Sequence, residues 1–197
     1  MINIAILTSD DGDCTEKIIQ YFNEFDETTK TAPFQDARIS CIVTNNNPNI
    51  FKKLRRYKVE KYTTDKYIEI DEILTKHNIH YIVLSNYSDK IPPNFCNKYQ
   101  YRIVNLHQSL LPKYSDKIGI NIHESVKANG ENKTGISIHF VNQEPNNITF
   151  FQKDVQIYPE ETAEEIMHKV QILEHKYYPV IIEKLIRGTY NQLFEKK

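Results

Sequence analysis

The sequence has no tryptophan and contains only 5 glycines, 2 methionines and 3 cysteines among its 197 residues. The cysteines, Cys14, Cys41 and Cys96, are odd in number and widely spaced, a pattern that fits neither a disulfide framework nor a metal-binding motif. We therefore expect reduced thiols, no bound metal and a cytoplasmic protein.

Long apolar segments and a surplus of one charge are also missing. No apolar run approaches the ~20 residues needed to cross a bilayer, and the chain begins with a predicted strand and not with a signal peptide. The formal net charge is -1, so no overall basic field favours nucleic acid or an anionic membrane surface. We expect neither as a partner, and we expect a monomer or a homodimer.

What is present is the composition of an ordinary globular domain. Hydrophobic residues make up 40% and charged residues 26% of the chain, which is enough for a full core. No internal repeat and no second domain is visible. We predict a single domain over residues 1–197, with a loosely attached tail from about residue 188.

Short apolar segments alternate with segments of helical spacing. The first unit is a strand at Asn3–Thr8, a turn at Ser9–Cys14 and a helix from Thr15 onward, as in the opening of a doubly wound fold. Further strands are predicted at residues 38–44, 59–62, 80–84, 101–104, 134–141 and 149–157, and helices at 51–54, 65–77, 92–99, 119–129 and from 163. The predicted fold class is α/β, with a Rossmann-like, doubly wound, mostly parallel sheet, a C-terminal antiparallel hairpin and a long C-terminal helix.

Spacing also predicts which side chains are buried. In the helix at 65–77 we expect Ile68, Ile73 and Leu74 to face inward. The strand at 134–141 alternates apolar residues with Ser137 and His139, which predicts that it is only half-buried.

The last helix begins at a capping box, Thr162-Ala163-Glu164-Glu165, and Pro179 is expected to kink or restart it. Glu174 lies on a face that the residue pattern alone would leave in solvent. The side chains expected to face inward are those of Ile166, Val170, Leu173 and Tyr177.

The most informative stretch follows the apolar strand at 101–104. Asn105 and His107 are two residues apart, so their side chains point the same way if the strand continues. Pro112 then ends regular structure, because it has no N–H to donate. An amide donor and an imidazole are therefore expected side by side at the carboxyl end of a strand, where open α/β sheets bind ligands.

Residues 105–114 read Asn-Leu-His-Gln-Ser-Leu-Leu-Pro-Lys-Tyr. This segment closely resembles the Asn-x-His-x-Ser-Leu-Leu-Pro-x-Tyr signature of the folate-dependent formyltransferases. The resemblance implies the formyltransferase fold, N10-formyltetrahydrofolate as co-substrate, no metal, and formyl transfer to a primary amine. Among the members of this family, the length of the chain favours those that formylate glycinamide ribonucleotide in purine biosynthesis, so we expect this amine as the acceptor. The resemblance also implies that Asn105 and His107 are catalytic.

The loop after the first strand resembles the family's Ser-Gly-x-Gly-Ser-Asn, which holds a substrate phosphate. Ser9 and Gly12 are retained, whereas Asp10 and Asp13 stand where the family has Gly and Ser, and Cys14 where it has Asn. Substrate-binding roles are implied for Ser9, Gly12, Asp13 and Cys14. The added carboxylates should repel a phosphate, and we expect Asp13 to cap the following helix.

Two further segments carry implied binding roles. The segment after the fourth strand corresponds to the family's pterin pocket, although it is more polar here. The resemblance implies folate-binding roles for Tyr87, Ser88, Asp89, Lys90, Ile91 and Asn142. In the last helix, the stretch beginning Val170-Gln171 resembles the family's Val-Gln-x-x-Glu-His-x-x-Tyr-Pro. The implied acceptor-binding residues are Gln108, Gln171 and Glu174.

The third catalytic position of the family is an aspartate, and here it reads Asn146. An asparagine still forms hydrogen bonds but brings no charge to raise a histidine pKa. Two interpretations therefore stay open: an active formyltransferase, for glycinamide ribonucleotide or another amine such as an amino sugar, or an impaired relative that only binds. A metal between His107, His123 and His139 is not supported by their spacing.

Overall fold

The computed structural model describes residues 1–24, 34–45, 47–142 and 148–190. Its strands are β1 (Ile2–Thr8), β2 (Ala37–Thr44), β3 (Glu60–Thr63), β4 (Tyr81–Ser85), β5 (Ile103–His107), β6 (Lys133–Phe140) and β7 (Ile148–Gln156). Its helices are α1 (Asp13–Asn23), α2 (Ile50–Lys53), α3 (Tyr67–Lys76), α4 (Pro93–Lys98), α5 (Ile120–Ala128) and α6 (Ala163–Ile186).

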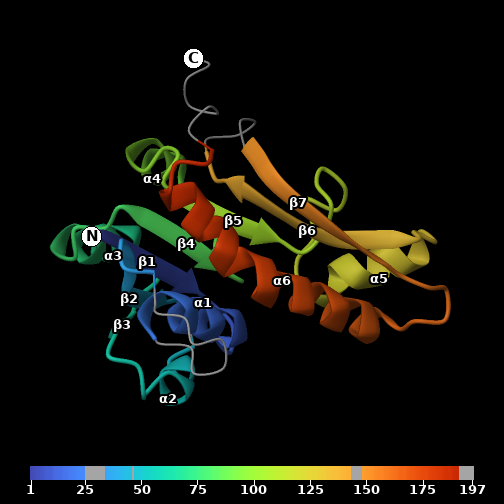
Figure 1. Cartoon of the computed structure of the whole chain (residues 1–197), viewed down its shortest axis with the longest axis horizontal. Helices are drawn as coiled ribbons and strands as arrows, with labels where there is room; N and C mark the ends of the chain where they lie inside the picture. Colours follow the sequence, from blue (N-terminus) through green and yellow to red (C-terminus); the bar gives the residue numbers. More distant parts are fainter. Residues whose placement is uncertain (25–33, 46, 143–147, 191–197) are drawn as a thin grey trace.

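The strands form one 7-stranded sheet in the order β3-β2-β1-β4-β5-β6-β7. The first five strands in this order run parallel to one another, whereas β6 runs antiparallel to both β5 and β7. The chain moves outward from β1 to β3 and then returns to β4 on the other side of β1 (Figure 1). This reversal opens a crevice beyond the carboxyl ends of β1 and β4. The predicted fold class is confirmed.

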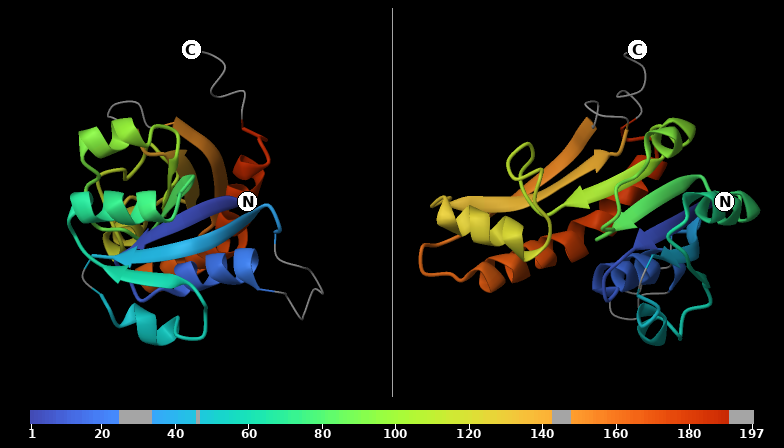
Figure 2. Two further views of the ribbon diagram at one scale, coloured as in Figure 1. Left: turned by 90° about the vertical axis from the view of Figure 1, so that its left-hand side faces the viewer. Right: turned by 180° about the vertical axis from the view of Figure 1, so that it is seen from behind.

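Helices cover both faces of the sheet, and alternate residues of β1 serve the two faces. Ile4 and Ile6 pack with residues of α1 and α6, whereas Ala5 and Leu7 pack with residues of α3 and α4. Figure 2 shows α1 and α6 on one side of the sheet and α3 and α4 on the other. A smaller cluster joins α5 to the start of α6 through Val126 and Ile166.

Several predicted details of burial are wrong. Ile68 is 78% exposed, because the inward stripe of α3 is formed by Ile70 and Leu74, one turn apart. Ser137 and His139 are buried, since β6 lies inside the sheet between β5 and β7 and is covered on both faces.

Helix α6 also differs from the prediction in two respects. It begins at the predicted capping box, in which Thr162 accepts from the Glu165 N–H, but it continues through Pro179 without a restart. Its buried stripe runs through Val170, Glu174 and Tyr178, so Glu174 is 2% exposed and not solvated. Within the described residues, no helix is long and apolar enough to cross a membrane.

The part of the predicted tail that the structure describes is packed. The ring of Tyr190 lies 4.8 Å from that of Phe150, centroid to centroid, so aromatic contact holds the chain against β7. The remainder of the predicted tail, residues 191–197, lies outside the described residues.

Tyr178 anchors α6 to the centre of the sheet. Its side chain is fully buried, and its hydroxyl lies 2.8 Å from the carbonyl oxygen of Leu84 and 3.0 Å from that of Val104. These carbonyls belong to β4 and β5, close to their carboxyl ends. The hydroxyl therefore fixes the distance between the helix and the strands that border the crevice.

We expect Tyr178→Phe to lower the free energy of unfolding by about 1–3 kcal/mol, because it removes a buried donor from carbonyls that have no access to water. Urea denaturation followed by circular dichroism measures this. Tyr177→Phe, on the same helix but only partly buried, is the matched control and should change stability by less than about 0.5 kcal/mol. Equal effects of the two variants would contradict the anchoring role.

Candidate active site

Asn105 and His107 lie at the carboxyl end of β5 with their side chains on the same side of the strand. Both are partly buried, whereas Leu106 between them is buried in the core beneath α1 and α6. This alternation agrees with the predicted placement. The two side chains have separate partners, His139 for Asn105 and the Tyr114 carbonyl for His107.

The hydrogen bond of His107 defines which ring nitrogen faces the reaction. Its Nε2 lies 2.9 Å from the carbonyl oxygen of Tyr114, and a carbonyl oxygen only accepts, so Nε2 carries the hydrogen. In the neutral ring, Nδ1 then keeps a free lone pair. Burial lowers the pKa of His107, and the Tyr114 carbonyl and Asp116 only partly oppose this. The neutral imidazole is therefore the main form at pH 7.

The loop that carries the Tyr114 carbonyl is held from several sides. Tyr114 has a φ of 60°, a left-handed conformation that needs support from its surroundings. Its hydroxyl donates to Glu131 Oε1 (3.1 Å) and accepts from the Asn129 amide (3.0 Å). These contacts fix the residue that orients His107.

The start of the same loop is attached to β6 and β7. The Ser137 hydroxyl accepts from the Leu111 N–H (2.9 Å) and donates to the Ser109 carbonyl (2.6 Å), and Gln152 donates to the Leu111 carbonyl (2.9 Å). The Leu111–Pro112 peptide bond is cis. The antiparallel strands thus hold the loop in place behind His107.

His139 is a site residue that the sequence analysis placed only on a polar strand face. It pairs with Asn105 across β5 and β6, and its Nε2 lies 3.2 Å from the Asn105 amide nitrogen. Burial lowers the pKa of His139 to about 4, so the ring is neutral and accepts the hydrogen bond. The alternation of polar and apolar residues in β6 could have indicated this role, because the polar face of β6 is the face that meets Asn105 and His107.

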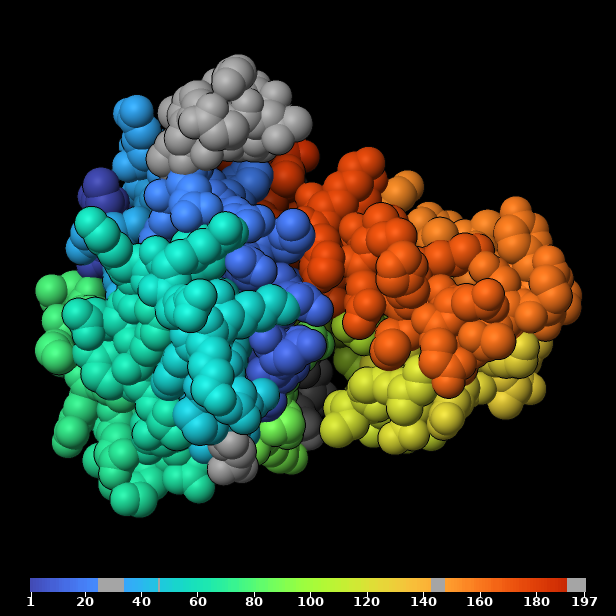
Figure 3. Space-filling model, turned by 90° about the horizontal axis from the view of Figure 1, so that it is seen from below, coloured from blue at the N-terminus to red at the C-terminus, as the bar shows by residue number. Residues whose placement is uncertain are grey.

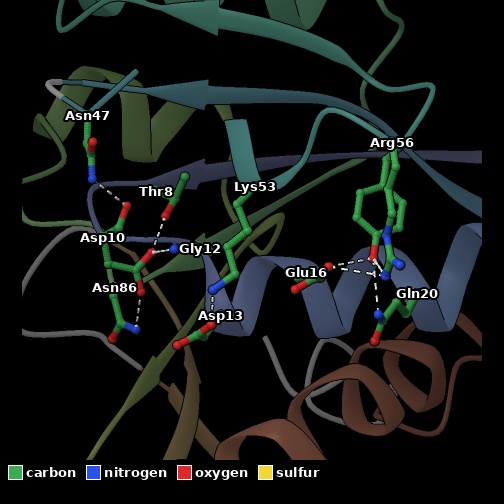
Figure 4. A network of polar contacts seen from close by, with 11 residues as sticks. Thr8, Asp10, Gly12, Asp13, Glu16, Gln20, Asn47, Lys53, Arg56 and Asn86 are labelled. Atoms are coloured by element: carbon green, nitrogen blue, oxygen red, sulfur yellow. Dashed lines mark hydrogen bonds and ion pairs between the residues drawn. The ribbon is translucent and has the colours of Figure 1, made fainter. Parts of the chain in front are cut away.

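The loop before α1 is folded around a carboxylate (Figure 4). Asp10 Oδ1 accepts from the Gly12 N–H and the Thr8 hydroxyl, each at 2.9 Å, and its Oδ2 accepts from the Asn86 amide at 2.7 Å. Gly12 has a φ of 87°, and a Cβ there would lie 2.6 Å from Ile50 Cγ1. The Gly12 N–H of this loop is thus already hydrogen-bonded to the carboxylate of Asp10.

The prediction that Asp13 caps α1 is wrong. The N-cap is Gly12, without a side-chain hydrogen bond, and Asp13 is the first residue of the helix. Its carboxylate instead forms an ion pair with Lys53 of α2 (Figure 4). Cys14 is buried behind it, and burial together with Glu174 raises the pKa of its thiol well above the usual range.

The loops assigned to the acceptor and to folate touch one another. The Ser88 N–H and hydroxyl lie 2.9 and 3.0 Å from the Ser9 hydroxyl, and the Asn45 amide donates to the Ser88 hydroxyl at 3.2 Å. Tyr87 and Ile91 pack against the core beneath α3 and α4. The structure thus joins the loops that follow β1, β2 and β4 at the crevice.

Of the remaining folate candidates, Asp89 and Lys90 directly follow Ser88 at this junction, whereas Asn142 lies near the amino end of β5. Asp89 Oδ1 accepts from the Ser88 hydroxyl (3.4 Å), the Lys90 carbonyl accepts from Tyr67 (3.4 Å), and the buried Asn142 accepts from the Tyr101 N–H (3.3 Å). Asn146, the proposed third catalytic residue, lies outside the described residues.

Gln108 and Glu174 form a buried pair between β5 and α6. The Gln108 amide donates to Glu174 Oε2 at 2.7 Å. Burial raises the pKa of Glu174, while hydrogen bonds from Cys14 and Gln108 lower it. Gln171 lies one turn earlier on α6 and is partly buried. Figure 3 shows the surface hollowed between the N-terminal half of the chain and helices α5 and α6.

Within the described residues, no group of three or more histidine, cysteine, aspartate or glutamate side chains is placed to hold a metal ion. His123 is instead a fully buried residue of α5, whose Nε2 lies 3.5 Å from Gln108 Oε1. Burial, with a smaller effect of His107, lowers the pKa of His123 to about 4.

The comparisons with known proteins agree with this geometry. The sequence pattern of the family described as formyl transferase matches residues 2–182, and the chain belongs to that family. It is 26% identical over 200 residues to phosphoribosylglycinamide formyltransferase of Haemophilus influenzae, covering 95% of this chain and 89% of the relative.

Solved structures of the same enzyme superpose closely. The one from Bacillus halodurans has a TM-score of 0.80 at 26% identity, covering 96% of this chain and 97% of that one. The one from Anaplasma phagocytophilum has a TM-score of 0.82 at 24% identity, covering 94% and 87%. The match to the formyl transferase family over residues 2–182 confirms the expected family, and these structures agree with its fold.

The buried neutral histidines predict a loss of stability in acid. His123 and His139 have pKa values of about 4 in the folded protein, below the ~6.5 of an unfolded chain. The contribution of these two histidines to the free energy of unfolding is therefore fully present above pH ~6.5. It is lost as the pH drops from there to ~4, by at most about 3 kcal/mol per histidine. Urea denaturation at several pH values measures this.

The variant His123→Gln removes one of these titrations, so it should reduce the change in stability between pH 6.5 and 4 by at most about 3 kcal/mol, while His107 and His139 still contribute. Asn121→Ala, at an exposed position without an ionisable side chain, is the control and should leave the pH dependence as it is. A flat stability curve over this range in the wild-type protein would contradict the neutral assignment of both rings.

Proposed function

We propose that the protein transfers a formyl group from N10-formyltetrahydrofolate to the primary amine of glycinamide ribonucleotide. The observation that carries this proposal is the pair Asn105 and His107 on one side of β5, within a chain of the formyl transferase family. The names of its relatives support the acceptor. The proposal includes a single cytoplasmic domain that acts as a monomer or homodimer without a metal.

Attack of the amine on the formyl carbon produces a tetrahedral oxyanion, which the side chains at the end of β5 are suited to stabilise. The Asn105 amide carries two hydrogens. One is directed to His139 Nε2 at 3.2 Å, which leaves the other for the oxyanion. Preorganised donors of this kind act most strongly where water is excluded.

His107 is suited to handle the proton that leaves the amine. With Nε2 directed to the Tyr114 carbonyl, its Nδ1 lone pair accepts this proton, and the resulting imidazolium donates it to the leaving nitrogen of the folate. The lowered pKa of His107 means that the ring starts neutral and ready to accept. The proposed acceptor contacts are Ser9, Gly12, Asp13, Cys14, Gln171 and Glu174, whereas the Gln108 amide is buried against Glu174. The proposed folate contacts are Tyr87, Ser88, Asp89, Lys90, Ile91 and Asn142.

One observation favours an acceptor other than glycinamide ribonucleotide. The Asp10 carboxylate accepts from the Gly12 N–H at 2.9 Å, the kind of donor that a phosphate would use at a helix N-terminus. A phosphate bound there would meet a negative charge at close range. An amine without a phosphate, such as an amino sugar, would avoid this repulsion.

Purified protein with N10-formyltetrahydrofolate and either glycinamide ribonucleotide or an amino sugar tests the proposal by release of tetrahydrofolate. We expect turnover with the ribonucleotide, and a loss of about 10²–10³ in kcat for Asn105→Ala. Asn121→Ala, at an exposed position on α5, should keep the wild-type rate. Turnover with the amino sugar alone would favour the second acceptor, and binding without turnover would contradict catalysis.

Position 146 gives a second test that depends on sequence alone. If Asn146 stands where the family has its aspartate, Asn146→Asp should raise kcat by about tenfold or more, because a carboxylate stabilises the protonated form of His107. The same change combined with Asp13→Ser covers the case in which phosphate binding limits the rate. No gain in either variant would contradict the assignment of position 146.

A further inference from the structure

The carboxylate of Glu174 is buried, and an amide is its closest partner. Glu174 is 2% exposed, and within the described residues no lysine or arginine forms an ion pair with it. Its hydrogen-bond partners are the amide of Gln108, at 2.7 Å, and the thiol of Cys14. A buried carboxylate without an ion-pair partner depends on such donors to remain ionised.

The geometry of β5 explains why Gln108 reaches this carboxylate. Asn105 and His107 point to one side of the strand, whereas Leu106 points to the side covered by α1 and α6. Gln108 is the next residue in this alternation and is buried on the side of Leu106. On α6, Glu174 lies one turn after Val170 and one turn before Tyr178, within the buried stripe.

The Gln108 amide is also held at its other end. Its Oε1 lies 3.5 Å from Nε2 of His123, a fully buried ring that its lowered pKa of about 4 keeps neutral. The oxygen of the amide therefore faces His123, and its nitrogen faces Glu174. An ionised carboxylate has no hydrogen to donate, so it can only accept from this nitrogen. The orientation of the amide is fixed from both sides.

We propose that Gln108 is a positioning residue that prepares Glu174 for the acceptor. By donating to Oε2 it favours the ionised carboxylate and leaves the other lone pairs for donor groups of the acceptor. This inference rests on the proposed function, in which Glu174 contacts the acceptor and the formyl group reacts at Asn105 and His107. Loss of the Gln108 amide should therefore weaken acceptor binding and leave the chemical step unchanged.

Gln108→Met keeps the length of the side chain and removes the donor. We expect the KM for glycinamide ribonucleotide to rise by about tenfold or more, since the lost hydrogen bond is to a charged group, with kcat and the KM for the folate within about twofold of wild type. Gln20→Met makes the same exchange on α1, where Gln20 bonds Tyr57, and should leave all three constants unchanged.

A double-mutant cycle shows whether Gln108 acts through Glu174. Glu174→Gln alone should raise the KM for the acceptor, and adding Gln108→Met to it should bring no further rise, because the two residues act as a unit. Additive effects, a fall in kcat, or a rise in the KM for the folate would overturn the inference. If Gln108→Met does not fold, Gln108→Asn, whose amide is one methylene too short to reach Glu174, replaces it.

The pKa of Glu174, measured by NMR on protein labelled at the glutamate carboxyl carbons, separates this inference from the proposed function. We expect it to rise in Gln108→Met, because a donor to the charged form is lost. An unchanged pKa overturns the inference even if formyl transfer is observed. A wild-type protein without turnover would refute the proposed function, while a raised pKa would still support the role of Gln108.

Discussion

The alternation of side chains along β5 is the constraint on which the site depends. Because β5 is an interior strand, covered on both faces, each successive residue at its carboxyl end is committed to one side or the other. Asn105 and His107 go to the side where β6 presents His139, and Gln108 goes to the side where α6 presents Glu174. A shift of one residue in the pairing of β5 would exchange these sets and dismantle both arrangements.

The described contacts around Asn105, Asp10 and Asp13 contain little unpaired positive charge. His139 is neutral because it is buried, Lys53 is paired with Asp13, and the carboxylate of Asp10 is surrounded by neutral donors. A ligand in this part of the crevice would therefore be held by directed hydrogen bonds more than by attraction between opposite charges. Such a site distinguishes ligands by where their donors and acceptors lie, and it depends less on ionic strength than a basic site does.

The sequence was sufficient for the features that are local in the chain. The strand-and-helix order, the placement of Asn105 and His107, and the capping box of α6 all follow from short-range spacing. The partner of Asn105 could not be found in this way, because the pairing with His139 depends on the register between two strands 34 residues apart. The burial of Glu174 was missed for a similar reason. A charged side chain can be buried in a helix only if another element donates hydrogen bonds to it, and here the donor is Gln108, which is distant in the sequence.

The loop before α1 shows a second limit of sequence reasoning. A carboxylate near a helix N-terminus is most often a cap, and this assigned Asp13 to that role. In the structure the loop bends around the other aspartate, Asp10, and a lysine from a distant helix takes up Asp13. Which of two neighbouring aspartates turns inward is decided by Thr8 and Asn86, and local spacing does not reveal their positions.

Gly12 separates these two aspartates, and it constrains how the loop can change. With a φ of 87° and a hypothetical Cβ only 2.6 Å from Ile50 Cγ1, any larger residue would push α2 away from α1 and strain the backbone as well. Asp10 and Asp13, by contrast, stand where the resembling family pattern has Gly and Ser. A change in what this end of the crevice binds should therefore come from substitutions on either side of Gly12, while position 12 itself stays glycine.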